Sequence, residues 1–196
     1  QAVGTAGDVN GDGYDDVIVG AYGYDNDLTD EGCVFVYYGS AAGLSTVASW
    51  TAEGDQDTAL LSISVGTAGD VNGDGYDDVI AGSSNYDNPE NAEGVAFVYY
   101  GSADGLSPTV SWMGESNQAY AWLGYSVSTA GDVNGDGYDD VIAGAYGYET
   151  NSSLSQQGAA FVYYGGSSGL SATADSMALG VRANAWFGFP VGTAGD

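Results

Sequence analysis

Short apolar runs alternate with polar, glycine-rich segments along the whole chain. A run such as Val34–Tyr38 is β-branched and aromatic, and its flanks are rich in Gly, Asn, Asp and Ser, which is typical of a strand between turns. No segment of about 11 residues shows the three-to-four spacing of an amphipathic helix without an interrupting Gly. The pattern therefore predicts an all-β protein.

The same pattern returns at a fixed period. The string TAGDVNGDGYDDVI begins at Thr5, Thr67 and Thr129, so the repeat is 62 residues long. An aromatic block containing FVYYG follows in each copy, and a tryptophan block comes next at Trp50 and Trp112. Each complete repeat thus contains four short predicted strands, the first near Val3 and its equivalents, the second just after the Asp-rich string.

Four antiparallel strands in a repeat of this length predict the blade of a β-propeller. A parallel β-helix has shorter coils, and an immunoglobulin-like sandwich would not repeat at this period. The predicted units are blade repeats at residues 1–64, 65–126 and 127–190, followed by residues 191–196 as the start of a further repeat or a swapped terminal strand.

Three blades are too few to close a ring, because propellers have about 4 to 8 blades. We therefore expect either a homo-oligomer or a part of a longer repeat chain. In both cases other blades would cover the two outer faces. Val191 to Asp196 repeats Val3 to Asp8, and Asp196 would be the first ligand of a fourth loop.

Charge excludes several classes of function. The chain has 27 acidic residues against one basic residue, Arg182, and no His, for a formal net charge of -26. Nucleic acid and anionic lipid are bound through clustered Lys and Arg, so neither is an expected partner. Without His or Lys, the usual nucleophile pairs, Schiff bases and zinc sites are absent, which predicts that the protein is not an enzyme. Apolar runs such as Cys33–Tyr38 are also far shorter than the ~18 residues of a membrane span, so no membrane insertion is expected.

The Asp-rich string is the part of the repeat that carries chemistry. Within D-V-N-G-D-G-Y-D-D, oxygen side chains occupy positions 1, 3, 5 and 9, Gly is at position 6, and the Tyr at position 7 offers its backbone carbonyl. Alternate oxygens followed by this Gly match the start of a calcium loop. The candidate metal ligands are Asp8, Asn10, Asp12, Tyr14 and Asp16 in the first repeat, Asp70, Asn72, Asp74, Tyr76 and Asp78 in the second, and Asp132, Asn134, Asp136, Tyr138 and Asp140 in the third.

These loops predict three Ca²⁺ ions, one per repeat, because Ca²⁺ prefers 6 to 8 oxygen ligands and Mg²⁺ suits such a loop less well. They are not EF-hands, since position 12 holds Val19, Ala81 or Ala143 in place of the bidentate Glu. Dockerin loops share the opening, but they are helical and lie about twenty residues apart.

These residues resemble the FG-GAP repeats of integrin alpha-subunit β-propellers and of bacterial extracellular proteins. The FG element is present as Phe187-Gly188 and in altered form as Leu123-Gly124, and the GAP element as Gly20-Ala21-Tyr22 and Gly144-Ala145-Tyr146. The calcium loop between the two elements is intact three times. The resemblance implies a four-stranded blade with calcium bound in the loop that joins its first two strands.

Two simpler interpretations of the Asp loops are disfavoured. The first is a solvated acidic turn without metal, but three copies of three close carboxylates would repel strongly without a cation. The second is a glycosidase pair at Asp15-Asp16, but neighbours on a strand point to opposite faces. We expect each ion to stabilise the fold of its blade and not to recognise a ligand.

The aromatic columns are expected to pack between blades, because both alternate sets of Val34–Tyr37 are apolar. Binding would then use the loops, whose acidic residues favour a cationic partner or further divalent ions. These loop acids include Asp25, Asp27, Asp30, Glu31, Asp87, Glu90 and Glu93.

The resulting hypothesis is a non-enzymatic, calcium-stabilised β-propeller module for adhesion or ligand recognition, with an unidentified protein or glycan ligand. Calcium sites of modest affinity fill at millimolar calcium, which indicates an extracellular or cell-surface location. One alternative is a structural building unit of a self-assembling propeller or filament. Another is a carbohydrate-binding or sugar-active module.

Overall fold

The computed structural model describes residues 2–195, which form three four-stranded antiparallel sheets. In each sheet the strands pair in chain order. The first contains β1 (Val3–Gly7), β2 (Asp16–Ala21), β3 (Cys33–Tyr37) and β4 (Trp50–Glu53); the second β5 (Leu61–Gly69), β6 (Asp78–Ser83), β7 (Val95–Tyr99) and β8 (Trp112–Glu115); the third β9 (Leu123–Gly131), β10 (Asp140–Ala145), β11 (Ala159–Tyr163) and β12 (Ser176–Leu179). The predicted all-β fold with four-stranded blades is confirmed.

The only helical segment within residues 2–195 is a single 3₁₀ turn, η1 (Ser152–Leu154). No helix in this part of the chain has the length and apolar character needed to cross a membrane.

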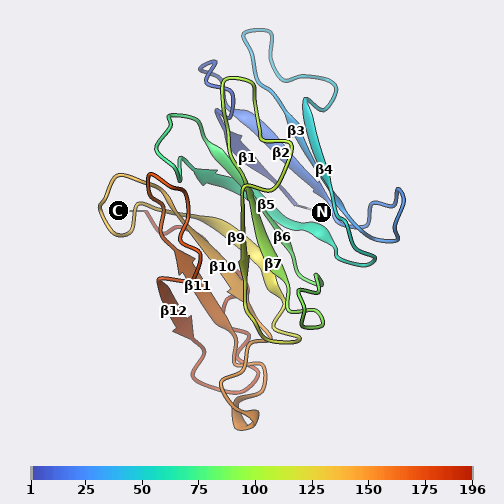
Figure 1. Cartoon of the computed structure of the whole chain (residues 1–196), viewed down its shortest axis with the longest axis vertical. Helices are drawn as coiled ribbons and strands as arrows, with labels where there is room; N and C mark the ends of the chain where they lie inside the picture. The colour runs from blue at the N-terminus through green and yellow to red at the C-terminus, as the bar shows by residue number, and fades with distance from the viewer. Residues whose placement is uncertain (1, 196) are drawn as a thin grey trace.

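The three sheets follow one another in chain order, with the middle sheet between the other two (Figure 1). Strand β5 packs against β1 and β2, and β9 packs against β5 and β6. The first strand of each blade therefore lies against the first two strands of the blade before it, which brings the turns after β1, β5 and β9 to the same end of the molecule.

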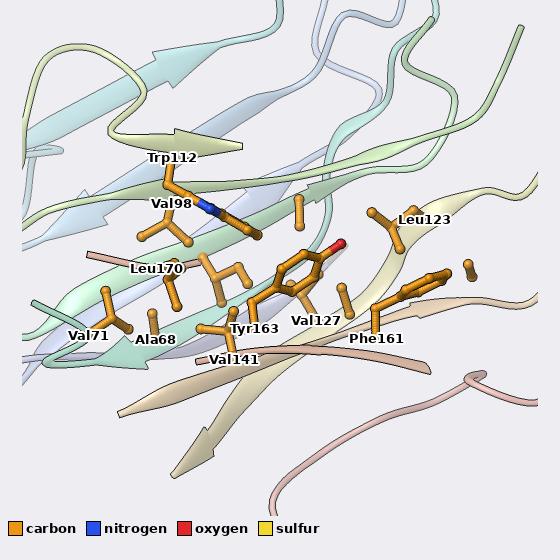
Figure 2. Packing of buried hydrophobic residues seen from close by; sticks show 14 of the residues in the cluster. Ala68, Val71, Val98, Trp112, Leu123, Val127, Val141, Phe161, Tyr163 and Leu170 are labelled. Atoms are coloured by element: carbon orange, nitrogen blue, oxygen red, sulfur yellow. The ribbon is translucent and has the colours of Figure 1, made fainter. Parts of the chain in front are cut away.

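Two apolar clusters fill the spaces between blades. Figure 2 shows the cluster between the second and third blades, where Trp112 lies over Tyr163 with ring centroids 4.8 Å apart. The indole Nε1 of Trp112 donates to the carbonyl oxygen of Ser171 at 3.0 Å. Trp50 repeats both contacts one blade earlier, on Tyr99 and Ser107. Trp50 and Trp112 thus each join their own blade to the next one.

Burial of the aromatic columns depends on the blade. Phe97, Tyr99, Phe161 and Tyr163 are buried, as the sequence predicts. In contrast, Trp186, which follows the last strand of the third blade, is 53% exposed. The columns are covered wherever a neighbouring blade is present.

Residues 191–195 lie beside β9. The backbone N–H of Val191 donates to Ser126 Oγ at 3.0 Å, just as Val127 N–H donates to Ser64 Oγ at 3.1 Å one blade earlier. This short segment therefore repeats the contact that β9 makes with β5. The predicted ligand Asp196 lies outside the described residues.

Candidate metal-binding loops

Each Asp-rich loop begins where a bulge ends the first strand of its blade. The register between β1 and β2 shifts between Thr5 and Gly7, and Thr5 Oγ1 accepts the N–H of Gly7 at 3.1 Å. Gly7 has a φ of 76° and lies so close to the Asp77 carboxyl group that a Cβ would collide with it. Glycine is required here for both reasons.

The oxygens at positions 1, 3 and 5 are oriented by the loop's own backbone. In the first loop Asp8 accepts N–H groups from Asp12 and Gly13, at 3.0 and 2.8 Å. Asn10 Oδ1 also accepts from Asp12, and Asp12 Oδ1 accepts from Tyr14, each at 3.0 Å. The second and third loops repeat these bonds from Asp70, Asn72 and Asp74 and from Asp132, Asn134 and Asp136. The three loops therefore have one conformation.

The position-9 aspartates, Asp16, Asp78 and Asp140, are fully buried. Asp78 Oδ2 accepts the N–H of Val71 at 3.1 Å, and its Oδ1 accepts the N–H of Gly101 at 2.8 Å. This carboxylate thus holds its own loop against the turn that follows β7. The pKa of Asp78 is raised to about 7, mainly by burial and also by the nearby carboxylates Asp74 and Asp70, while the two N–H donors oppose the shift.

The tyrosines at position 7 have a contact that sequence reasoning did not foresee. The ring of Tyr76 lies against Gly11 of the preceding loop, and the ring of Tyr138 lies against Gly73 in the same way. Tyr14, in the first of the three described blades, is 44% exposed. Besides the backbone carbonyl expected of them, Tyr76 and Tyr138 thus pack one loop on the next.

The position-8 aspartates link the loops directly. Asp77 Oδ2 accepts the N–H of Asp8 at 2.8 Å, and the N–H of Asp77 donates back to the Asp8 carbonyl at 3.2 Å. Asp139 and Asp70 form the same pair of bonds, at 3.0 and 3.2 Å. The sequence signal for this role is the first Asp of the Asp-Asp pair, which is present in all three copies without a place among the expected ligands.

The oxygen ligands of each loop suit a hard cation such as Ca²⁺, although the carboxylate groups are too far apart to bind an ion in their present positions. Within residues 2–195, no three acidic side chains stand close enough to hold a metal ion as they are. Each loop nevertheless offers three carboxylates and an amide oxygen, and a carboxylate oxygen that accepts one N–H keeps a second lone pair. The position-9 carboxylate is buried and lies near the carboxylates at positions 1 and 5, and both effects raise its pKa. A bound cation would oppose them and stabilise the charged form of this carboxylate. The loops fit calcium by this chemistry.

Two of the acidic turn residues expected at the surface are in fact buried. Glu31 is 3% exposed and Glu93 is fully buried, in the turns between the second and third strands of their blades. These two acids, which were expected to favour a cationic partner or further divalent ions, are therefore not displayed on the surface of the turns.

Four antiparallel strands in chain order, stacked sheet on sheet with an Asp-rich first turn, define a repeat protein built of propeller blades. The chain belongs to the FG-GAP repeat family. The family model described as "FG-GAP repeat" matches residues 1–37, 63–99 and 123–163.

Similar curated proteins are integrin alpha subunits. The chain is 32% identical to integrin alpha-4 of Xenopus laevis over 146 residues, 33% identical to integrin alpha-6 of Homo sapiens over 141, and 34% identical to integrin alpha-IIb of Mus musculus over 148. These matches cover 72%, 70% and 71% of this chain, but only 14%, 12% and 14% of the three relatives.

Proposed function

We propose that this chain is a non-enzymatic, calcium-stabilised β-propeller module of an extracellular or cell-surface protein, serving adhesion or ligand recognition. The observation that carries the proposal is the Asp-rich loop itself, which has the same internal hydrogen bonds three times and is joined to its neighbours. Membership of the FG-GAP family and similarity to integrin alpha subunits support it.

Calcium would be held by the side-chain oxygens at positions 1, 3, 5 and 9 and the position-7 carbonyl of each loop. When bound, the ion supplies two positive charges to a group of three carboxylates. Asp8, Asp12 and Asp16 form that group in the first loop, and the protein's own residues offer it only N–H donors. The role of the ion is structural, because it would hold the end of one strand pair and so the interface with the next blade.

Asp74→Ala is expected to remove one Ca²⁺ per chain and leave the other two loops largely occupied. Asp74 is exposed and touches its own loop, so the loss should stay local. Equilibrium dialysis at millimolar calcium measures the count. The matched control is Asp104→Ala, an exposed acid outside the loops, which should not change the number of bound ions. An Asp74→Ala chain that binds as many ions as the wild type would contradict the proposal.

A self-assembling structural unit remains the first alternative, and exposed apolar side chains on the outer blades favour it. Val3 is 74% exposed on the first blade, and Phe187 and Phe189 are 42% and 47% exposed beside the third. We propose that other blades cover these faces. Light scattering at micromolar concentration should then show a species larger than 19.8 kDa for this chain alone. A soluble, well-folded monomer would contradict assembly.

A carbohydrate-binding module is the second alternative, and one groove favours it. The groove lies between the β8–β9 connection and the β10–β11 turn. Tyr120, which is 55% exposed, and Trp122 line it, and Trp122 stacks on Tyr146 with ring centroids 5.0 Å apart. Gln118, Glu149 and Gln156 also line it. Flat aromatic faces beside polar groups suit a sugar ring, and a glycan array with and without chelator distinguishes this function from recognition of a protein.

A further inference from the structure

Glu93 is a buried carboxylate with an oxygen that bonds to nothing. It lies in the turn between β6 and β7 and is fully buried. Its Oε2 accepts the N–H of Asn117 at 3.1 Å, whereas its Oε1 has no hydrogen-bond partner. The backbone N–H of Asn88 faces the carboxyl group of Glu93 and lowers its pKa. This N–H is nevertheless not positioned to form a hydrogen bond with Oε1. An unpaired buried carboxylate oxygen is costly and calls for a partner.

The groups around Glu93 are themselves acidic. Glu90, from the same turn, has a buried Oε2 that is also without a partner. Glu115, at the end of β8, accepts from Asn88 Nδ2 at 2.6 Å and from Asn117 Nδ2 at 3.2 Å. The pKa of Glu93 is raised to about 7, mainly by burial and also by the charges of Glu115 and Glu90. The charges that act on Glu93 are therefore all negative.

The other two blades show that this acidity is not needed for folding. In the first blade Glu31 is buried, but its Oε1 accepts the N–H of Asn26 at 3.0 Å, and Leu28 takes the place of Glu90. In the third blade the equivalent residue is Gln157, whose Oε1 accepts from Thr150 Oγ1 at 3.0 Å. A neutral amide thus fits the same place in the fold. Only the second blade has three glutamates here, two of which, Glu90 and Glu93, have a buried unpaired oxygen.

We propose that Glu93, Glu90 and Glu115 bind a divalent cation of the calcium type. Carboxylate oxygens are the ligands that Ca²⁺ prefers, and the ion would satisfy both unpaired oxygens at once. The site lies at the opposite end of β6 from the loop of Asp70–Asp78, so it is separate from the predicted calcium loops. Because the three carboxyl groups are not gathered within metal-binding distance, occupancy turns the half-buried Glu90 and Glu115 side chains toward Glu93.

Glu93→Gln is the direct test, since the third blade accommodates Gln at this position. The variant is expected to bind one fewer Ca²⁺ per chain in equilibrium dialysis. Glu31→Gln is the matched control, because it removes a similarly buried glutamate without a buried unpaired oxygen, and it should keep the wild-type count. Glu90→Gln, at a half-buried position, should weaken calcium binding at the site at least tenfold and provides a second variant if Glu93→Gln folds poorly.

Nuclear magnetic resonance locates the ion. The amide signal of Asn117, which donates to Glu93, should shift with added calcium in the wild type and not in Glu93→Gln. An unchanged ion count in both Glu93→Gln and Glu90→Gln would overturn the proposal. So would an Asn117 signal that responds to pH near 7 and not to calcium, which would indicate a buried proton.

Asp74→Ala separates this site from the calcium loops. If Glu93→Gln loses an ion and Asp74→Ala does not, the glutamate site stands and the loops fail. If only Asp74→Ala loses an ion, the loops stand and the glutamate site is refuted.

Discussion

Chelation with EDTA is expected to lower the melting temperature of this protein by tens of degrees. Each loop holds three carboxylates, so without the ion the native state keeps three groups of uncompensated charge. Binding to the native state alone contributes about 2.7 kcal/mol per site at a hundredfold excess of calcium over Kd, or roughly 8 kcal/mol for three sites. At ~2–4 °C per kcal/mol for a chain of this size, the expected shift is about 15–30 °C.

Calorimetry or circular dichroism in EDTA and in millimolar calcium measures this shift. Asp74→Ala should show a smaller difference between the two conditions, because one of its loops has lost a ligand. Magnesium at the same concentration should restore less of the melting temperature than calcium. Coinciding curves in EDTA and calcium would show that the ions, if bound, do not hold the fold.

Asp78→Ala is expected to destabilise the protein by about 2–5 kcal/mol even in EDTA. The carboxylate of Asp78 accepts the N–H groups of Val71 and Gly101, and Ala would leave both without a partner inside the protein. An unsatisfied buried donor costs about 1–3 kcal/mol. Denaturant unfolding in EDTA measures the loss independently of any ion.

The control for this prediction is Asp74→Ala under the same conditions. Asp74 is exposed and accepts from Tyr76 within its own loop, so its removal should cost less than about 1 kcal/mol in EDTA. Equal losses for the two variants would show that the buried carboxylate does not join its loop to the turn after β7. Asp78→Asn, which keeps one acceptor oxygen, should fall between them.

The strands and their order could be predicted because each repeat carries its own pattern. The aromatic block becomes β3, β7 and β11, and the Asp-rich string becomes the turn after the first strand in all three blades. The loop conformation also follows locally, since the bonds of Asp8 to Asp12 and Gly13 span only a few residues. Occupancy by calcium is indicated by the residue types at positions 1, 3, 5 and 9 of each loop, and it stays a prediction.

Contacts between repeats could not be predicted in the same way. Asp77 bonds to Asp8 across 69 residues, and nothing in either string says which face of the next blade it will meet. Burial of Glu93 was missed for a related reason, because an acidic residue among Asn, Pro and Glu is normally exposed, and only the fold shows that Asn117 and Glu115 come over it. The sequence signal that was available is the replacement of this glutamate by Gln157 in the third copy.

Paired hydrogen bonds join Asp77 to Asp8 and Asp139 to Asp70, so the three loops form a linear array in which each loop is bonded only to its neighbours. In the first two loops the first expected ligand, Asp8 or Asp70, is positioned by the blade that follows it, so the affinity of that loop for an ion would depend on whether the neighbouring blade is folded. Stability is then a sum of blade terms and nearest-neighbour terms, as in other repeat proteins. In such an array, ion release and unfolding would start together at an end blade and spread inward, and each blade added to the array would sharpen the transition.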